Sequence, residues 1–314
     1  MRHVALGRSG LTVGVVGLGT LTWGRRTPAE EARAMLGRFL SAGGDLVDTA
    51  HGYGDGEAET ILGALLDEVG RDNVTVVTKA GVVRGPSGSV VDTSRRTLMR
   101  QLDTSLSRLR THHVDVWLVN AWSARTPLEE TLSALEWAWR SGRARYVGVS
   151  NYSGWQLARA VSLAERLGMP LVCDEVEYSL LDRGAEHEVL PAAEALGAGV
   201  LAWSPLGRGV LTGKYATSTP SDSRGASTDF AGFVQARLGE QSAQVVGAVT
   251  TAARGLRLTP ATLSLAWVLS RPAVSAAVVG PRNERQLANL LEGVDTTVPA
   301  EIAAVLDEVS ASSL

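Results

Sequence analysis

The sequence has 314 residues, a length that fits one large domain or two domains of ordinary size. Its hydrophobic fraction of 45% and its charged fraction of 20% are those of a soluble globular protein that can bury a sizeable core. The net charge of −3, without a block of Lys and Arg on one face, gives no sign of a nucleic-acid partner.

The single cysteine, Cys173, lies in the apolar run "PLVCDEV", where we expect a buried thiol on a strand. One cysteine excludes disulfide stapling, and a reducing cytoplasm is then the natural compartment. The amino terminus lacks the apolar region of a signal peptide, and no apolar run reaches the ~18 residues of a membrane span. We therefore expect a cytoplasmic protein with no membrane partner.

Short apolar runs alternate with longer helical patterns along the chain. The runs expected to form strands are residues 12–20, 45–50, 73–80, 114–120, 144–151, 170–178, 198–204 and 274–280. The helical patterns are residues 27–43, 57–69, 93–109, 127–142, 153–168, 184–197 and 283–291, with further helices near Ala243 and Ala261. Thr27 is the expected N-cap of the first helix, with Pro28 at its first position.

The order of these elements predicts an α/β fold. Eight near-continuously apolar strands, each followed by a helical segment, suit a parallel sheet that is buried on both faces. We expect a closed (β/α)₈ (TIM) barrel, formed as one domain by residues 1–314; an open doubly wound sheet is the rival. The barrel is favoured because polar residues stand at the carboxyl ends of the strands, which would converge on one mouth. They are Asp48, Lys79, Asn120, Ser150, Asn151, Glu175 and Ser204.

Asp48, Tyr53 and Lys79 suggest a proton donor at this mouth. A free tyrosine has a pKa of about 10 and is a poor acid at neutral pH. A nearby ammonium would stabilise the phenolate and lower that pKa, and Asp48 can supply the counter-charge for Lys79. A salt bridge beside an ordinary packing tyrosine explains the three residues equally well.

The stretch "DTAHGYGDGEAETILG" resembles the signature of the aldo-keto reductase superfamily. The resemblance continues through "GLGTLTWG", "YVGVSNYSGWQL", "LAWSPLGRGVLTGKY" and "VVGPRNERQLANL", over almost the whole chain. Within the superfamily, it is closer to the bacterial and potassium-channel β-subunit-like branch. The resemblance implies a (β/α)₈ barrel that reduces carbonyls with NADPH, with Asp48, Tyr53 and Lys79 in three catalytic places and Tyr53 as general acid.

The fourth catalytic place departs from the family, which usually has histidine where this chain has Asn120 in "WLVNAW". An asparagine amide donates a hydrogen bond to a substrate carbonyl but cannot carry charge or relay a proton. A weakened donor to a developing oxyanion costs about 10²–10³ in rate. We expect hydride transfer to survive slowly, or Asn120 to reposition the substrate so that a conjugated carbon is reduced.

The chain lacks the complete glycine fingerprint of a Rossmann dinucleotide site. The residues expected to bind NADPH are therefore those that the resemblance implies. Trp203 would stack on the nicotinamide, Lys214 and Arg224 would hold the diphosphate, and Arg282 would pair with the 2′-phosphate. The full set is Gly19, Thr20, Leu21, Ser150, Asn151, Glu175, Trp203, Ser204, Leu206, Gly207, Gly209, Lys214, Arg224, Gly280, Arg282, Gln286 and Asn289. Glu175 replaces the usual glutamine, and Asn289 is one position off the usual asparagine.

Trp23, His51 and Trp122 are the candidates for the substrate pocket. His51 could stand in for the missing histidine, although a polar loop residue is the simpler interpretation. No metal site is expected, because His112 and His113 lie at the opposite end of the barrel with no further cluster.

Three functions remain open. The first is an NADPH-dependent reductase of a small aldehyde, ketone or ketosugar. The second is an enone or double-bond reductase in deoxysugar or natural-product tailoring. The third is a cofactor-sensing binding subunit with slow turnover. We expect a small-molecule carbonyl substrate and allow for a homo-oligomer.

Overall fold

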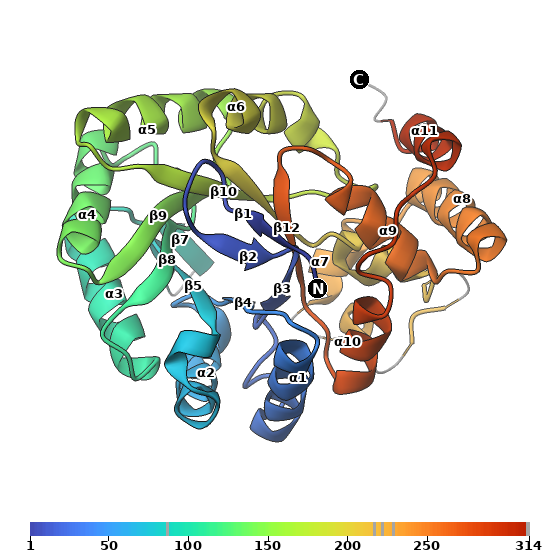
Figure 1. The fold of residues 1–314 in the computed structure, drawn as a ribbon, viewed down its shortest axis with the longest axis horizontal. Helices are drawn as coiled ribbons and strands as arrows, with labels where there is room; N and C mark the ends of the chain where they lie inside the picture. The colour runs from blue at the N-terminus through green and yellow to red at the C-terminus, as the bar shows by residue number, and fades with distance from the viewer. Residues whose placement is uncertain (86–87, 216–217, 221–222, 228–229, 312–314) are drawn as a thin grey trace.

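A computed structural model describes residues 1–85, 88–215, 218–220, 223–227 and 230–311. Among these residues, eight parallel strands close into a barrel in the order β3, β4, β5, β8, β9, β10, β11 and β12, with β12 paired back to β3 (Figure 1). The predicted (β/α)₈ barrel is thus confirmed, and the open sheet is excluded. The barrel strands are β3 (Val16–Gly19), β4 (Leu46–Asp48), β5 (Thr75–Ala80), β8 (Val114–Val119), β9 (Ala144–Ser150), β10 (Leu171–Glu177), β11 (Gly199–Trp203) and β12 (Val274–Val279).

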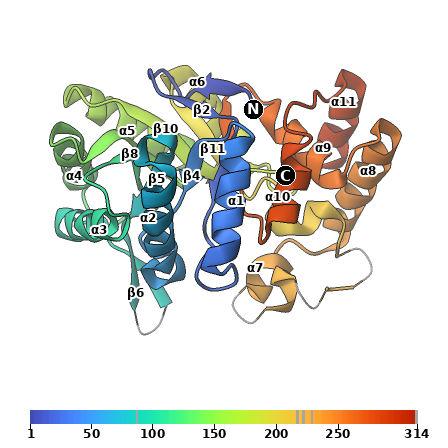
Figure 2. The same ribbon diagram turned by 60° about the horizontal axis from the view of Figure 1, so that its bottom comes forward.

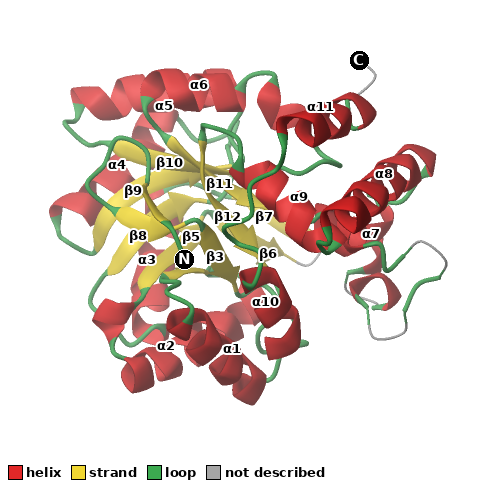
Figure 3. Ribbon diagram, turned by 45° about the vertical axis from the view of Figure 1, so that its right-hand side comes forward, coloured by secondary structure: helices red, strands yellow, loops and turns green. Residues whose placement is uncertain are grey.

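Helices surround the barrel as an outer layer (Figure 1). They are α1 (Ala29–Ser41), α2 (Glu57–Val69), α3 (Arg95–Arg108), α4 (Leu128–Arg140), α5 (Gly154–Arg166), α6 (Val189–Leu196), α9 (Pro260–Leu269) and α10 (Glu284–Leu291). Two further helices, α8 (Glu240–Leu256) and α11 (Ala300–Val309), pack together outside α9 (Figure 3). None of the described helices has both the length and the apolar composition needed to cross a membrane.

The start of α1 differs from the prediction. The helix begins at Ala29 after Pro28, which holds the cap position without a side-chain hydrogen bond. The hydroxyl of Thr27 is instead 3.0 Å from that of Thr22 in the preceding turn. Thr27 is therefore not the N-cap, because a neighbouring hydroxyl takes its hydrogen bond.

The side chains of each strand alternate between the barrel interior and the helices, and this alternation places the polar groups. An interior apolar cluster contains Leu46, Val77, Leu118, Cys173 and Leu201, and Cys173 is buried on β10 as predicted. Each of these five residues is followed, two positions later in the sequence, by one residue of a second set: Asp48, Lys79, Asn120, Glu175 and Trp203. Because residues two apart on a strand share a face, these five side chains form a layer next to the interior apolar cluster, toward the carboxyl ends of the strands.

The two ends of the barrel differ. A hairpin of β1 (His3–Ala5) and β2 (Thr12–Gly14) covers the amino-terminal end and adds Leu6 and Val13 to the interior cluster. A hairpin of β6 (Val82–Gly85) and β7 (Gly88–Val91) extends from the opposite end, as does the short helix α7 (Ala231–Gln235) (Figure 2). The polar layer therefore faces the end of the barrel at which these two insertions stand.

Candidate active site

Tyr53 reaches the barrel mouth through a tight turn after β4. Asp48 is the last residue of that strand, and the chain then runs beside β5, where the His51 N–H donates to the Lys79 carbonyl at 3.0 Å. The Tyr53 N–H donates to the Ala50 carbonyl at 3.0 Å and closes the turn. These bonds bring the Tyr53 ring centroid to 5.5 Å from the Lys79 Nζ atom.

The glycines after Tyr53 serve the backbone of this turn. Gly54, Asp55 and Gly56 have φ values of 60°, 58° and 99°, in the left-handed region that glycine adopts without strain. A Cβ atom on Gly56 would lie 2.2 Å from the Arg108 guanidinium. Asp55 has no such freedom, and its carboxylate pairs with Arg25 and Arg84 across the rim. Gly54 and Gly56 are therefore required by the turn.

Lys79 contacts two carboxylates, one more than the sequence predicted. Its ammonium is hydrogen-bonded to Asp48 Oδ1 and lies 2.9 and 3.1 Å from the two Glu175 carboxylate oxygens. Asp48 is 3% exposed, and Lys79 and Glu175 are 2% exposed. We call these three residues the Lys79 cluster. It contains one positive group and two acidic groups that are shielded from solvent.

Burial controls the protonation of this cluster. Burial lowers the pKa of Lys79, but Asp48 and Glu175 outweigh it and raise the pKa above its ordinary value. Burial and the neighbouring Glu175 raise the pKa of Asp48. Burial also raises the pKa of Tyr53, and Lys79 offsets only part of the rise. The predicted lowering of the phenol pKa is therefore wrong in its net sign for the free protein, because desolvation exceeds the attraction of the ammonium.

Asn151 links three strand ends at the mouth. Its Nδ2 group donates to the Asn120 carbonyl at 2.9 Å and to Ser150 Oγ at 3.0 Å. Its Oδ1 atom accepts from Trp203 Nε1 at 3.0 Å. Ser150 Oγ in turn donates to the Glu175 carbonyl at 2.8 Å. The ends of β8, β9, β10 and β11 thus hold one another in register.

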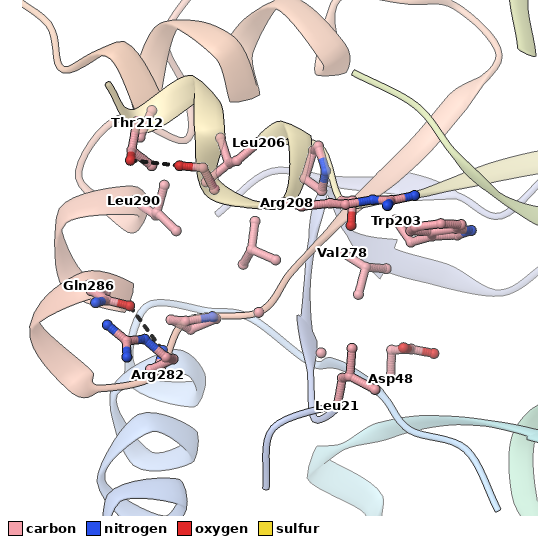
Figure 4. A pocket seen from close by; sticks show the side chains of 18 of the residues that line it. Leu21, Asp48, Trp203, Leu206, Arg208, Thr212, Val278, Arg282, Gln286 and Leu290 are labelled. Atoms are coloured by element: carbon pink, nitrogen blue, oxygen red, sulfur yellow. Dashed lines mark hydrogen bonds between the residues drawn. The ribbon is translucent and has the colours of Figure 1, made fainter. Parts of the chain in front are cut away.

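A cavity of about 530 Å³ joins most of the predicted residues. At one end lie Asp48, Leu21 and Trp203, and at the other lie Arg282, Gln286 and Leu290 (Figure 4). The predicted residues in its lining are Gly19, Leu21, Asp48, Tyr53, Lys79, Asn120, Ser150, Asn151, Glu175, Trp203, Ser204, Leu206, Gly209, Lys214, Gly280, Arg282, Gln286 and Asn289. All four predicted catalytic residues therefore share one space with most of the predicted cofactor residues.

Two predicted cofactor residues are not among the described residues of this lining. Thr20 and Gly207 are buried beside it. Arg224 begins a short 3₁₀ turn (Arg224–Ala226), and its side chain lies outside what the structure describes.

The three predicted substrate-pocket residues also lie elsewhere. Trp23 is 0% exposed, inside the core. His51 points toward α3, with Nδ1 3.4 Å from Ser105 Oγ and from an Arg108 nitrogen. Burial and Arg108 lower the pKa of His51 to about 4, so the ring is neutral at pH 7 and cannot replace a charged histidine. Trp122 packs edge-to-face on Tyr152 beside a separate small hollow.

Sequence reasoning missed several lining residues, of which Arg208 is the most informative. Arg208 donates to both Glu177 carboxylate oxygens, at 2.8 and 2.6 Å, and its guanidinium lies 3.8 Å from the Phe233 ring centroid. An arginine inside the glycine-rich "PLGRGVLTG" was a signal that could have been used. The lining residues that were not predicted are Pro205, Arg208, Thr212, Phe233, Thr259, Pro260, Ala261, Val278, Val279, Pro281 and Leu290.

The far end of the cavity is built on the start of α10. Asn283 caps this helix by accepting from the Gln286 N–H, and Gln286 Oε1 accepts from the Arg282 N–H at 3.0 Å. The amino end of a helix together with an arginine favours phosphate groups. No cluster of metal-ligating side chains occurs in the described part of the chain.

Comparison with known proteins agrees with this geometry. The model of the aldo/keto reductase family matches residues 15–311. An uncharacterized oxidoreductase, YrpG, of Bacillus subtilis is 35% identical over 98% of this chain and 96% of its own. A probable voltage-gated potassium channel subunit beta of Oryza sativa subsp. japonica is 35% identical over 99% of this chain and 96% of its own. The corresponding subunit of Arabidopsis thaliana is 34% identical over 98% and 95%.

Proposed function

The chain belongs to the aldo/keto reductase family, an oxidoreductase family, and from this premise we propose that it reduces the carbonyl group of a small molecule with NADPH. Tyr53 is the general acid of the proposal. The observation that carries it is the position of Tyr53 beside the Lys79 cluster, in a cavity whose other end offers Arg282 and the start of α10. The cytoplasm is the proposed compartment.

The residues of the cavity fit a nicotinamide dinucleotide. Ser150 and Asn151 present a hydroxyl and an amide suited to the carboxamide, and Trp203 offers a flat ring face. Lys214 and Arg282 provide positive charge for the diphosphate and the 2′-phosphate. The bound cofactor supplies the hydride of the reaction.

The side chains of the protein supply the proton of the reaction and stabilise the charge that its loss leaves behind. The Tyr53 hydroxyl donates its proton to the substrate oxygen as charge develops there, and the Lys79 ammonium stabilises the phenolate that remains. Asp48 and Glu175 keep Lys79 protonated. The Asn120 amide can donate a hydrogen bond to the same substrate oxygen.

A substrate screen tests the proposal directly. The purified protein is titrated with NADPH through its tryptophan fluorescence, and a panel of aldehydes, ketones and ketosugars is followed at the nicotinamide absorbance. NADPH binding with turnover of any member supports the reductase, and product structure separates carbonyl from double-bond reduction. Absence of NADPH binding contradicts the proposal.

A cofactor-sensing binding subunit is the second candidate. It is favoured by two relatives, 34–35% identical, whose names are those of potassium channel subunits beta. Tight NADPH retention with negligible turnover across the panel would select it over the reductase.

Arg282→Ala tests the choice between NADPH and NADH. We expect the dissociation constant of NADPH to rise roughly tenfold to hundredfold, the loss of one charged hydrogen-bonding partner, with NADH binding unchanged. Arg285→Ala is the matched control, because Arg285 is exposed in the first turn of α10, close to Arg282 in the sequence, and is not among the described residues of the cavity lining. An equal loss for NADPH and NADH in Arg282→Ala would remove the 2′-phosphate assignment.

Asn120→His tests the weakened donor. We expect simple aldehydes to be reduced about tenfold faster or more, within the range that one donor to a developing oxyanion contributes. The comparison is made at saturating NADPH, after titration has shown that cofactor binding is retained. No gain in rate under those conditions would show that Asn120 does not limit the reaction.

A further inference from the structure

The Lys79 cluster contains more acidic groups than the described positive groups can balance. Lys79 is the one cationic side chain, in the described part of the chain, that pairs with either Asp48 or Glu175. All three groups are at most 3% exposed, so water screens their charges little. With both carboxylates ionised the cluster carries a net charge of −1.

This excess charge stands beside the proposed nicotinamide position. Glu175 is the register partner of Ser150 in the barrel, and its backbone carbonyl accepts from Ser150 Oγ at 2.8 Å and from the Asn151 N–H at 2.9 Å. Ser150 and Asn151 are the proposed partners of the carboxamide. The Glu175 carboxylate lines the same cavity on the side of Lys79.

We propose that Glu175 makes the nicotinamide site selective for the oxidation state of the cofactor, binding the positively charged oxidised ring in preference to the neutral reduced ring. The proposal rests on the function proposed above. A carboxylate that Lys79 does not neutralise attracts a cationic ring and has no comparable effect on a neutral one. Glutamine at this position would leave Asp48 and Lys79 as a neutral pair and remove the preference.

The preference should grow with pH. The titratable groups whose charges interact with that of Glu175 are Asp48 on β4, Tyr53 in the following turn, Lys79 on β5, and Cys173 and Asp174 on β10. Burial and Glu175 raise the pKa of Asp48, so the cluster retains a proton at lower pH and releases it at higher pH. The net −1 state therefore becomes more populated as pH rises, and the oxidised cofactor gains affinity relative to the reduced one.

The test measures binding and needs no substrate. Dissociation constants of NADP⁺ and NADPH are determined by tryptophan fluorescence for the wild type and Glu175→Gln at pH 6.5 and pH 9. The 2′-phosphate is common to both forms, so its titration cancels in their ratio. We expect the wild-type preference for NADP⁺ to grow with pH, and Glu175→Gln to lower it by about tenfold or more at pH 9. In Glu175→Gln the ratio should not change with pH.

Glu59→Gln is the matched control. Glu59 is 0% exposed, pairs with Thr78 and Arg108, and does not line the cavity. Its substitution should leave the NADP⁺ to NADPH ratio unchanged.

Each outcome decides between the two proposals. A wild-type protein that binds neither form contradicts the proposed function, whatever Glu175 does. A protein that binds both forms with a ratio unaffected by Glu175→Gln, or with a wild-type ratio that does not change with pH, overturns the role of Glu175. An equal shift in Glu59→Gln also overturns it. The wild-type pH series still decides the matter if Glu175→Gln does not fold.

Discussion

Tyr53→Phe is expected to lower the turnover of any carbonyl substrate by about 10²–10⁴-fold, the usual contribution of a positioned general acid. The substitution removes only the hydroxyl and keeps the ring that lines the cavity beside Lys79. NADPH affinity should therefore stay at the wild-type value. Turnover is measured at saturating NADPH, so that the chemical step and not binding is compared.

Tyr152→Phe is the control for this experiment. Tyr152 is 2% exposed and packs against Trp122, and it lies outside the cavity lining. Loss of its hydroxyl should leave turnover unchanged. If Tyr53→Phe retains wild-type turnover, the proton comes from another donor, and the proposed mechanism has to be abandoned.

The barrel could be predicted from the sequence because its signal is periodic. Near-continuous apolar runs mark strands that are buried on both faces, and the last residues of those runs mark the mouth. A polar residue follows an interior apolar residue after two positions, as Asn120 follows Leu118 and Glu175 follows Cys173. The position of Asp48, Lys79 and Asn120 in one cavity follows from that spacing. Tyr53 reaches the same cavity through the turn after β4.

The loops could not be predicted in the same way, because the direction of a loop side chain follows from contacts that have no period. His51 is two residues from Tyr53, yet its ring turns toward Arg108 on α3. Trp23 follows "GLGTLT" and is packed into the core instead of the cavity. Arg208 contacts Glu177 and Phe233, which are distant in sequence, and no local sequence pattern predicts these contacts.

The direction of the pKa shifts in the Lys79 cluster and Tyr53 also could not be predicted from the sequence. The sequence placed Asp48, Tyr53 and Lys79 together, but the sign of a pKa shift depends on the competition between burial and neighbouring charges. A residue-type count carries a further hint. Lys79 and Lys214 are the only two lysines in the sequence, and both line the cavity. Arginine supplies every other basic side chain apart from histidine, so the two compact ammonium groups of this sequence are both in the cavity.

Lys79→Met is expected to produce the largest change in stability. Removing the ammonium leaves Asp48 and Glu175 buried without a counter-charge, and breaking a buried pair in this way costs about 3–5 kcal/mol of the free energy of unfolding. Urea denaturation at pH 8, compared with the wild type, measures the loss. Lys214→Met is the matched control and should change stability little, because Lys214 is only partly buried.

The loss should shrink as pH falls, and this distinguishes an electrostatic cause from lost packing. In Lys79→Met the pKa of Asp48 in the folded protein rises further above its unfolded value of about 4, because burial and repulsion from Glu175 act without the ammonium. The folded state then binds more protons than the unfolded state, so protonation restores stability at low pH. The difference from wild type should be largest at pH 8 and smaller at pH 5.5.

Adding Glu175→Gln to Lys79→Met should recover part of the loss at pH 8, because one buried carboxylate remains instead of two. A deficit that is equal at both pH values and unaffected by Glu175→Gln would assign Lys79 to packing, and the charge argument for Glu175 would fall with it.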